Sequence, residues 1–136
     1  MIDEGLVSLL AGDAGVKAIL ASGDAGSIYQ MVVPEDEAQY PCIGYQFVGG
    51  ASGGTFNTSG MQRSRVQLDC WAIRPEDGKH LAEAVRKALN GYQGLLSDGT
   101  YLSNAVLIHP GVDLFSDQSR FFRRMLEFYL LYNFNS

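Results

Sequence analysis

Two histidines and two carboxylates within predicted strands are the side chains of this sequence best suited to acid–base chemistry. His80 and His109 could each act as a general base. Asp69 or Glu127 could orient an imidazole, which makes a small hydrolase one hypothesis. Neither histidine has a cysteine, an aspartate or a second histidine at ligand spacing, and no nucleophile-elbow motif is present. We therefore expect no catalytic residue, and the hydrolase, which requires these side chains to converge in one pocket, is the more distant alternative.

A glycine-rich stretch over residues 49–61 is the next candidate for chemistry, because such stretches can bind phosphate. A phosphate-binding loop leads from a strand into a helix N-terminus and usually carries a lysine. Residues 49–61 instead connect two predicted strands and contain no lysine, which argues against nucleotide binding. Two interpretations stay open, a mobile hairpin tip and a segment that orders on a partner. The candidate partner-binding residues are Gly49, Gly50, Gly53, Gly54, Phe56, Asn57 and Met61.

The charge balance argues against recognition of nucleic acid. Ten basic and fifteen acidic residues give a net charge of −5, whereas nucleic-acid binding needs a basic stripe that displaces counterions. A local arginine cluster near the C-terminus is either a solvated strand end that discourages edge pairing or an electrostatic contact. For an acidic chain, we favour contact with an acidic neighbouring subunit over contact with nucleic acid. The candidate subunit interface comprises Glu35, Asp36 and Glu37 on one side and Arg120, Arg123 and Arg124 on the other.

The two cysteines are expected to be structural. Cys42 and Cys70 lie in apolar, strand-like runs, which predicts buried reduced thiols, and a disulfide would require neighbouring strands of suitable geometry. No spacing resembles a zinc site, so neither a metal nor another cofactor is expected. The N-terminus lacks the pattern of a signal peptide, and no apolar run approaches the ~20 residues of a membrane span. We therefore expect synthesis in the cytoplasm and no membrane partner.

Hydrophobic periodicity predicts the elements that must position these side chains. Residues 2–22 carry helical stripes interrupted at Gly12 and Asp13, which predicts an amphipathic helix with a bend. A second helix is expected after Pro75, and the sequence His109-Pro110-Gly111 is expected to end a strand. The predicted strands cover residues 28–33, 42–48, 63–73, 102–108 and 120–134.

This order predicts a single α+β domain over residues 1–136. We expect a mostly antiparallel sheet of four to five strands, with two helices packed on one face and the element order α-β-β-β-α-β-β. The 46% of hydrophobic residues suffice for a core of this kind. The 18% of charged residues lie below the usual share for a globular domain, which is compatible with a surface partly buried in an assembly.

Several segments, taken in order, resemble a family of small phage tail proteins. They are residues 2–16, residues 40–45, the strand 66–72 with the helix 81–91, and the closing strand 123–132. Their order and spacing, more than any one of them, resemble the tail-completion or tail-terminator (head-tail joining) proteins of long-tailed bacteriophages and prophages. The chain departs from that pattern at residues 111–113, where the family has an arginine–acid pair before the last hairpin.

The resemblance implies a structural role with no cofactor and no catalytic residue. Such proteins form a ring, commonly a hexamer, on the head-proximal end of the finished tail tube. The ring stops tube polymerisation and offers a surface to the head connector. The implied partners are further copies of the chain, the tail-tube protein and the head–tail connector protein. The implied location is the virion tail, after assembly in the host bacterial cytoplasm. The nearest alternative is another ring-forming component, such as a head–tail connector.

Replacement of both histidines tests the expectation that no chemistry depends on them. The double variant His80→Ala/His109→Ala should give phage particles at a yield within a few-fold of wild type, because neither imidazole has a catalytic or metal-binding neighbour in sequence. Particle titre is the measurement, with circular dichroism as the control for folding. A folded double variant that yields no particles would contradict this expectation.

Overall fold

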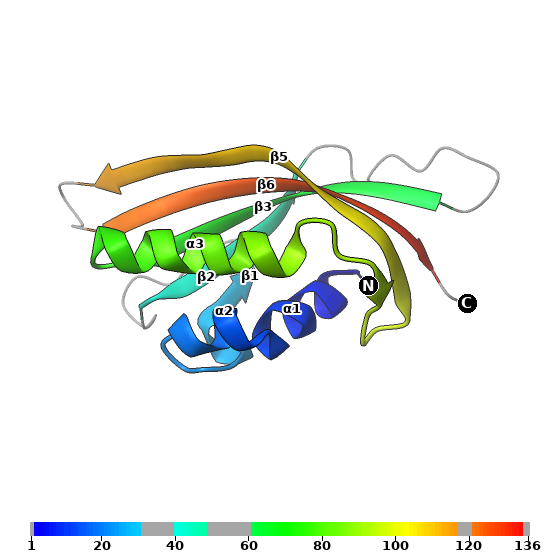
Figure 1. The fold of residues 1–136 in the computed structure, drawn as a ribbon, viewed down its shortest axis with the longest axis horizontal. Coiled ribbons are helices and arrows are strands. Elements are labelled where there is room, and N and C mark those ends of the chain that lie inside the picture. Colours follow the sequence, from blue (N-terminus) through cyan, green and yellow to red (C-terminus); the bar gives the residue numbers. More distant parts are fainter. Residues whose placement is uncertain (1, 31–39, 49–60, 117–120, 135–136) are drawn as a thin grey trace.

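The described chain is an α+β domain in which a six-stranded sheet packs against three α-helices (Figure 1). The structure is a computed structural model, and it describes residues 2–30, 40–48, 61–116 and 121–134. The elements in chain order are α1 (Ile2–Gly12), α2 (Ala14–Ile19), the 3₁₀ turn η1 (Ala25–Ser27), β1 (Ile28–Gln30), β2 (Cys42–Val48), β3 (Met61–Ala72), α3 (Pro75–Leu89), β4 (Gly94–Leu95), β5 (Thr100–Ser116) and β6 (Phe121–Phe134).

The sheet has the strand order β1-β2-β3-β6-β5-β4. Its pairs are antiparallel except for β1 and β2, which run parallel. The predicted α+β class is therefore right, but the sheet is mixed and has one strand more than expected. The additional strand, β4, has only two residues, too few for any periodicity to show in the sequence.

The N-terminal helical segment is split into two helices at the predicted bend. Asp13 is the N-cap of α2, and its carboxylate accepts a hydrogen bond from the backbone amide of Val16 at 3.1 Å. The helical layer thus contains α1, α2 and α3 rather than two helices. None of the described helices has the length and apolar character needed to cross a membrane.

Strand β5 continues beyond the point at which the sequence predicted its end. The sequence at residues 109–111 was expected to form a turn, yet β5 extends to Ser116 and stays paired with β6. Register shifts between Leu107 and His109 and between His109 and Val112 interrupt the ladder at this point. Such irregularities let a strand accept a proline without losing its partner, which explains why the predicted strand end was wrong.

One hydrophobic core fills the space between the helices and one face of the sheet. Helix α3 packs across the central strands β3 and β6, and α1 and α2 complete the helical layer (Figure 1). All helices contribute to the same cluster of buried side chains, so they cover the same sheet face. Its largest fully buried members are Phe128, Leu6, Leu10, Ile43, Leu68, Leu81, Leu89, Leu102, Leu126 and Leu130.

The opposite face of the central strands is covered by none of the described helices. Side chains alternate between faces along a strand, so the residues between the buried positions of β3 and β6 point away from the helices. We call this surface the open face. It consists of Arg63, Arg65, Gln67, Asp69 and Trp71 from β3 and Arg123, Met125, Glu127, Tyr129 and Leu131 from β6.

The closest approach between α3 and the sheet predicts an unusual response to a glycine substitution. A Cβ atom at Gly78 would lie 2.4 Å from Cδ1 of Phe122, whereas one at Gly12 would meet no atom within 4 Å. Gly78→Ala should therefore lower the free energy of unfolding by about 1–3 kcal/mol, despite the higher helix propensity of alanine.

The matched control is Gly12→Ala, for which we expect no loss and a gain of at most ~1 kcal/mol. Urea denaturation followed by circular dichroism measures both values. A Gly78→Ala variant as stable as Gly12→Ala would show that α3 can move away from β6 at little cost.

Candidate functional site

The residues proposed for hydrolysis lie on opposite sides of the sheet. Asp69 and Glu127 belong to the open face, whereas His80 is an exposed residue of α3, which packs on the other face. The sheet therefore separates His80 from both carboxylates. The backbone of His109 lies opposite Glu127 in the β5–β6 register, but its side chain is outside the described residues. The structure does not bring His80 into one pocket with Asp69 or Glu127, as that alternative requires.

Each open-face carboxylate has an arginine partner instead. Arg65 Nε donates a hydrogen bond to Glu127 Oε2 at 2.5 Å, and the Glu127 side chain is only 11% exposed. Arg123 Nη1 lies 4.0 Å from Asp69 Oδ2. Both carboxylate oxygens of Asp69 also accept hydrogen bonds from Gln67 Nε2. Burial raises the pKa of Asp69, while Arg123 and Gln67 oppose that rise. These pairs neutralise carboxylates that the sheet partly removes from water.

Two of the three open-face arginines also stack on aromatic rings. The guanidinium of Arg63 lies 4.7 Å from the centroid of the Tyr129 ring, and that of Arg123 lies 5.1 Å from the Trp71 ring. These contacts join β3 to β6. Sequence reasoning did not select Arg63 or Arg65 as functional, although the alternation of β3 already placed Arg65 and Trp71 on one face. The missing information was the pairing of β3 with β6.

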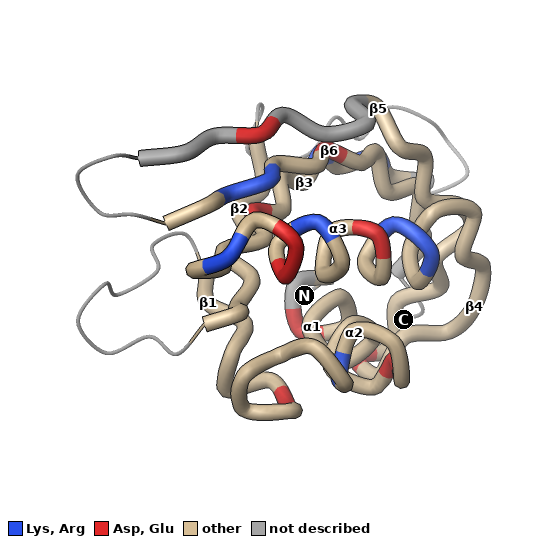
Figure 2. The backbone as a smooth tube through the Cα atoms, turned by 60° about the vertical axis from the view of Figure 1, so that its left-hand side comes forward, with Lys and Arg blue, Asp and Glu red and all other residues tan. Residues whose placement is uncertain are grey.

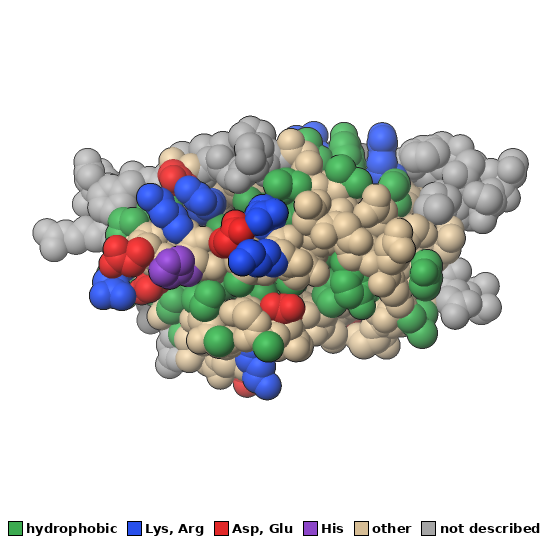
Figure 3. Space-filling model, in the orientation of Figure 1, with side chains coloured by type: hydrophobic (Ala, Val, Ile, Leu, Met, Phe, Trp, Pro, Cys, Tyr) green, Lys and Arg blue, Asp and Glu red, His purple; other side chains and the backbone are tan. Residues whose placement is uncertain are grey.

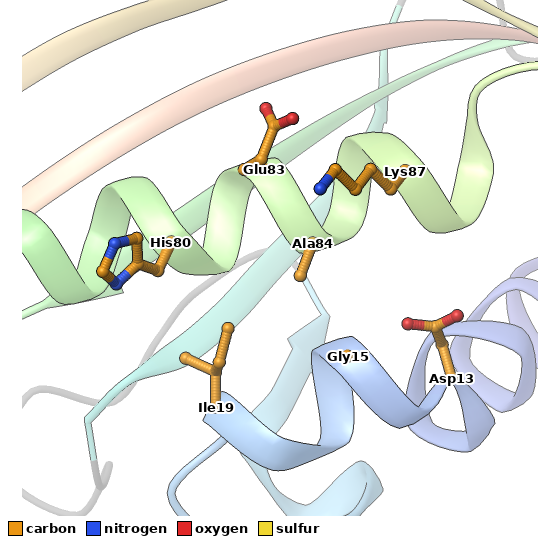
Figure 4. A pocket seen from close by; sticks show the side chains of 7 residues that line it. All are labelled: Asp13, Gly15, Ile19, His80, Glu83, Ala84 and Lys87. Atoms are coloured by element: carbon orange, nitrogen blue, oxygen red, sulfur yellow. The ribbon is translucent and has the colours of Figure 1, made fainter.

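A groove lies between α2 and α3 in the described part of the chain (Figure 4). Its volume is about 410 Å³, and Ile19 and Ala84 point toward one another across it. Side chains of both charge signs surround it on the helical side of the molecule (Figure 3). The lining residues are Asp13, Gly15, Ile19, His80, Glu83, Ala84 and Lys87.

The two carboxylates of this groove have structural partners. Glu83 accepts hydrogen bonds from Arg86, which lowers the pKa of the Glu83 carboxyl. Asp13 caps α2, so its carboxylate is likewise engaged. Among the described residues, no group of three or more His, Cys, Asp and Glu side chains could hold a metal ion. The groove thus has no ligand set for a metal ion among its described lining residues.

The arginines predicted to form one interface patch point to opposite faces of the sheet. Arg123 belongs to the open face, whereas Arg124, its neighbour in β6, pairs with Asp113 of β5, with Nη2 2.9 Å from Oδ2. This contact lowers the pKa of Asp113. The remaining predicted interface residues, Glu35, Asp36, Glu37 and Arg120, lie outside the described residues.

The predicted partner-binding loop also lies outside the described residues, except for its last position. Gly49, Gly50, Gly53, Gly54, Phe56 and Asn57 are not described, and Met61 is the first residue of β3. The loop therefore remains a prediction.

The prediction of two buried, reduced thiols is confirmed. Cys42 and Cys70 are free and fully buried. Burial raises the pKa of Cys42 to about 12 and that of Cys70 also above its usual range. The two residues lie on adjacent strands, but Cys70 pairs in register with Ile43, so Cys42 and Cys70 occupy opposite faces and cannot form a disulfide.

Fold and surface together describe an α+β domain whose central strands have one face that no described helix covers, and the comparisons identify its family. The family model described as "Tail completion protein gp17" matches residues 4–133. The chain therefore belongs to the tail completion protein gp17 family and is a structural component of a virion tail. This confirms the family resemblance read from the sequence.

A solved structure shares the fold. A chain in the virion of a native gene transfer agent (GTA) particle superposes with a TM-score of 0.62 and 18% sequence identity. The match covers 93% of this chain and 90% of that chain. At this identity the similarity concerns the fold. No curated protein sequence matches the chain.

The Arg65–Glu127 pair predicts a measurable contribution to stability. Arg65→Ala should lower the free energy of unfolding by about 1–2 kcal/mol, because it leaves the largely buried Glu127 carboxylate without its hydrogen-bond donor. Arg74→Ala is the matched control, since its partners Glu76 and Asp77 are more exposed, and it should lower the free energy of unfolding by clearly less than Arg65→Ala does.

Denaturant unfolding at neutral pH measures both variants. A second change, Glu127→Gln, made in the Arg65→Ala background, should recover part of the loss because it removes the unpaired charge. Equal stabilities of Arg65→Ala and Arg74→Ala would show that the open-face pair contributes no more than a surface ion pair.

Proposed function

We propose that the chain forms a hexameric ring on the head-proximal end of the tail tube, where it ends tube growth and joins the tail to the head. The observation that carries the proposal is the family match over residues 4–133, nearly the whole chain. The fold supports it, since no described helix covers one face of the central strands, which leaves that face open to a partner. The partners in this proposal are further copies of the chain, the tail-tube protein and the head–tail connector.

The proposed ring requires that one side of a subunit meets a different side of the next. The proposed interface pairs Arg120, Arg123 and Arg124 with the acidic residues Glu35, Asp36 and Glu37. Of the described members, Arg123 on the open face is the better candidate, because Arg124 is held by Asp113 within the chain. Exposed ion pairs contribute ~0–1 kcal/mol each, so the tube end would act as a template for ring closure.

A head–tail connector is the alternative within the same assembly, and a single imaging experiment separates the two functions. Electron microscopy of the purified protein mixed with connector-free tail tubes should show one ring at one end of each tube. The solution mass, measured in parallel, should rise from that of the 14.8 kDa subunit to that of a closed oligomer in the presence of tubes.

The imaging experiment distinguishes a ring on the tube, a head–tail connector and a monomer. Rings that bind isolated head connectors but never bare tubes would favour the connector function. Subunits that remain monomeric even on finished tails would refute the ring. An Arg123→Glu variant should cap tubes less efficiently, and the matched reversal Arg74→Glu, at an exposed arginine outside the proposed interface, should cap normally.

A further inference from the structure

The open face has the side-chain composition of a protein interface rather than that of a solvent-exposed sheet. Arginine, tryptophan, tyrosine and methionine are enriched where proteins meet, and lysine is depleted there. The open face contains Arg63, Arg65 and Arg123 together with Trp71, Met125 and Tyr129.

The positions of the lysines and arginines also indicate that the open face is an interface. All three lysines of the chain, Lys17, Lys79 and Lys87, lie on α2 and α3. The open face has arginines alone, and two of these stack on the rings of Tyr129 and Trp71. A stacked guanidinium is already held in place and is weakly hydrated, so it loses little freedom and little hydration when a partner covers it.

The two carboxylates of the open face, Glu127 and Asp69, are also held in place before any partner binds. Glu127 and Asp69 are 11% and 16% exposed in the single chain, although no described helix covers them. Both are paired with arginines, so a partner that covers this surface would not bury an unpaired carboxylate. Three arginines against two carboxylates leave the open face with a net positive charge in a chain of net charge −5.

The compensating negative charge is concentrated in the N-terminal part of the chain. The first 60 residues contain seven acidic residues and one lysine, whereas residues 61–136 contain eight acidic and nine basic residues. Among the described acidic residues, Glu4 and Asp13 lie on or beside α1 and α2, and Asp24 precedes η1. Figure 2 shows mostly acidic segments among the charged ones of the α1–α2 layer and both signs along α3.

We infer that the open face of one subunit docks onto the acidic α1–α2 layer of a second copy of the same chain. The two surfaces lie on different sides of the molecule, since α1 and α2 belong to the helical layer and the open face points away from it (Figure 1). The contact is therefore heterologous and repeats from copy to copy, as a ring requires. Complementary charge selects this partner and sets the orientation. The inference rests on the proposed ring. It keeps Arg123 on one side of the contact and assigns the acidic side to the α1–α2 layer in place of Glu35, Asp36 and Glu37.

A charge-reversal cycle tests the contact without disturbing the buried pairs. Arg63→Glu reverses an exposed cation of the open face, and Glu4→Lys reverses an exposed acid of α1. Each single variant should weaken subunit association by roughly tenfold or more, and the double variant should recover most of that loss. Lys79→Glu, the same reversal at an exposed residue of α3, is the matched control and should stay within roughly twofold of wild type.

Subunit association is measured by sedimentation velocity, alone and with tail tubes, and thermal unfolding confirms that each variant folds. If Arg63→Glu lowers stability, Arg63→Gln replaces it, with the same direction expected. Recovery by the double variant supports the contact between the two surfaces. Rings that form in all variants as in wild type overturn the choice of surface and leave the ring intact.

Two further outcomes also decide the question. If Arg63→Glu leaves self-association unchanged but abolishes tube binding, the open face meets the tube protein and not a second copy, which overturns the inference. If the wild-type chain stays monomeric with and without tubes, the ring and the contact fail together.

Discussion

The antiparallel pairing of β3 with β6 is the interaction on which the rest of the structure depends. It joins segments about half a chain apart and places them in the centre of the sheet, with Val66 opposite Phe128 and Leu68 opposite Leu126. One face of this pair forms one side of the core, onto which α3 packs so closely that a Cβ atom at position 78 would collide with the ring of Phe122. The other face becomes the open face. A single register thus determines both the hydrophobic core and the surface proposed to bind a neighbour.

The same pairing explains how the charged side chains of the sheet come to neutralise one another. Arg65 and Glu127 come from different strands and meet only because β3 and β6 are in register, and the same holds for Asp69 and Arg123. A partly buried carboxylate that is held by arginine is not left as an unpaired charge. The arrangement favours a rigid, preorganised surface, which is what an assembly subunit in a tail needs.

Membership in the tail completion family and the physical features of the chain agree on an assembly protein. The segregation of charge between an acidic N-terminal layer and an arginine-bearing sheet face gives each copy two unlike surfaces, which is the requirement for a contact that repeats around a ring. Arg124, grouped with Arg123 by sequence proximity, belongs instead to the ion pair with Asp113 that joins β5 to β6.

Local patterns in the sequence determined the helices, the long strands, the cap at Asp13 and the burial of both cysteines, because these depend on periodicity and on contacts between near neighbours. They also determined the family. Tertiary structure alone decided that β1 runs parallel to β2 and that β5 continues through Pro110. It also decided that Arg123 and Arg124 lie on different faces of the sheet. Which distant segments pair decides the strand direction, the bulges and the partners of a charged side chain. The alternation of apolar and polar residues along one strand does not show which strand will pair with it.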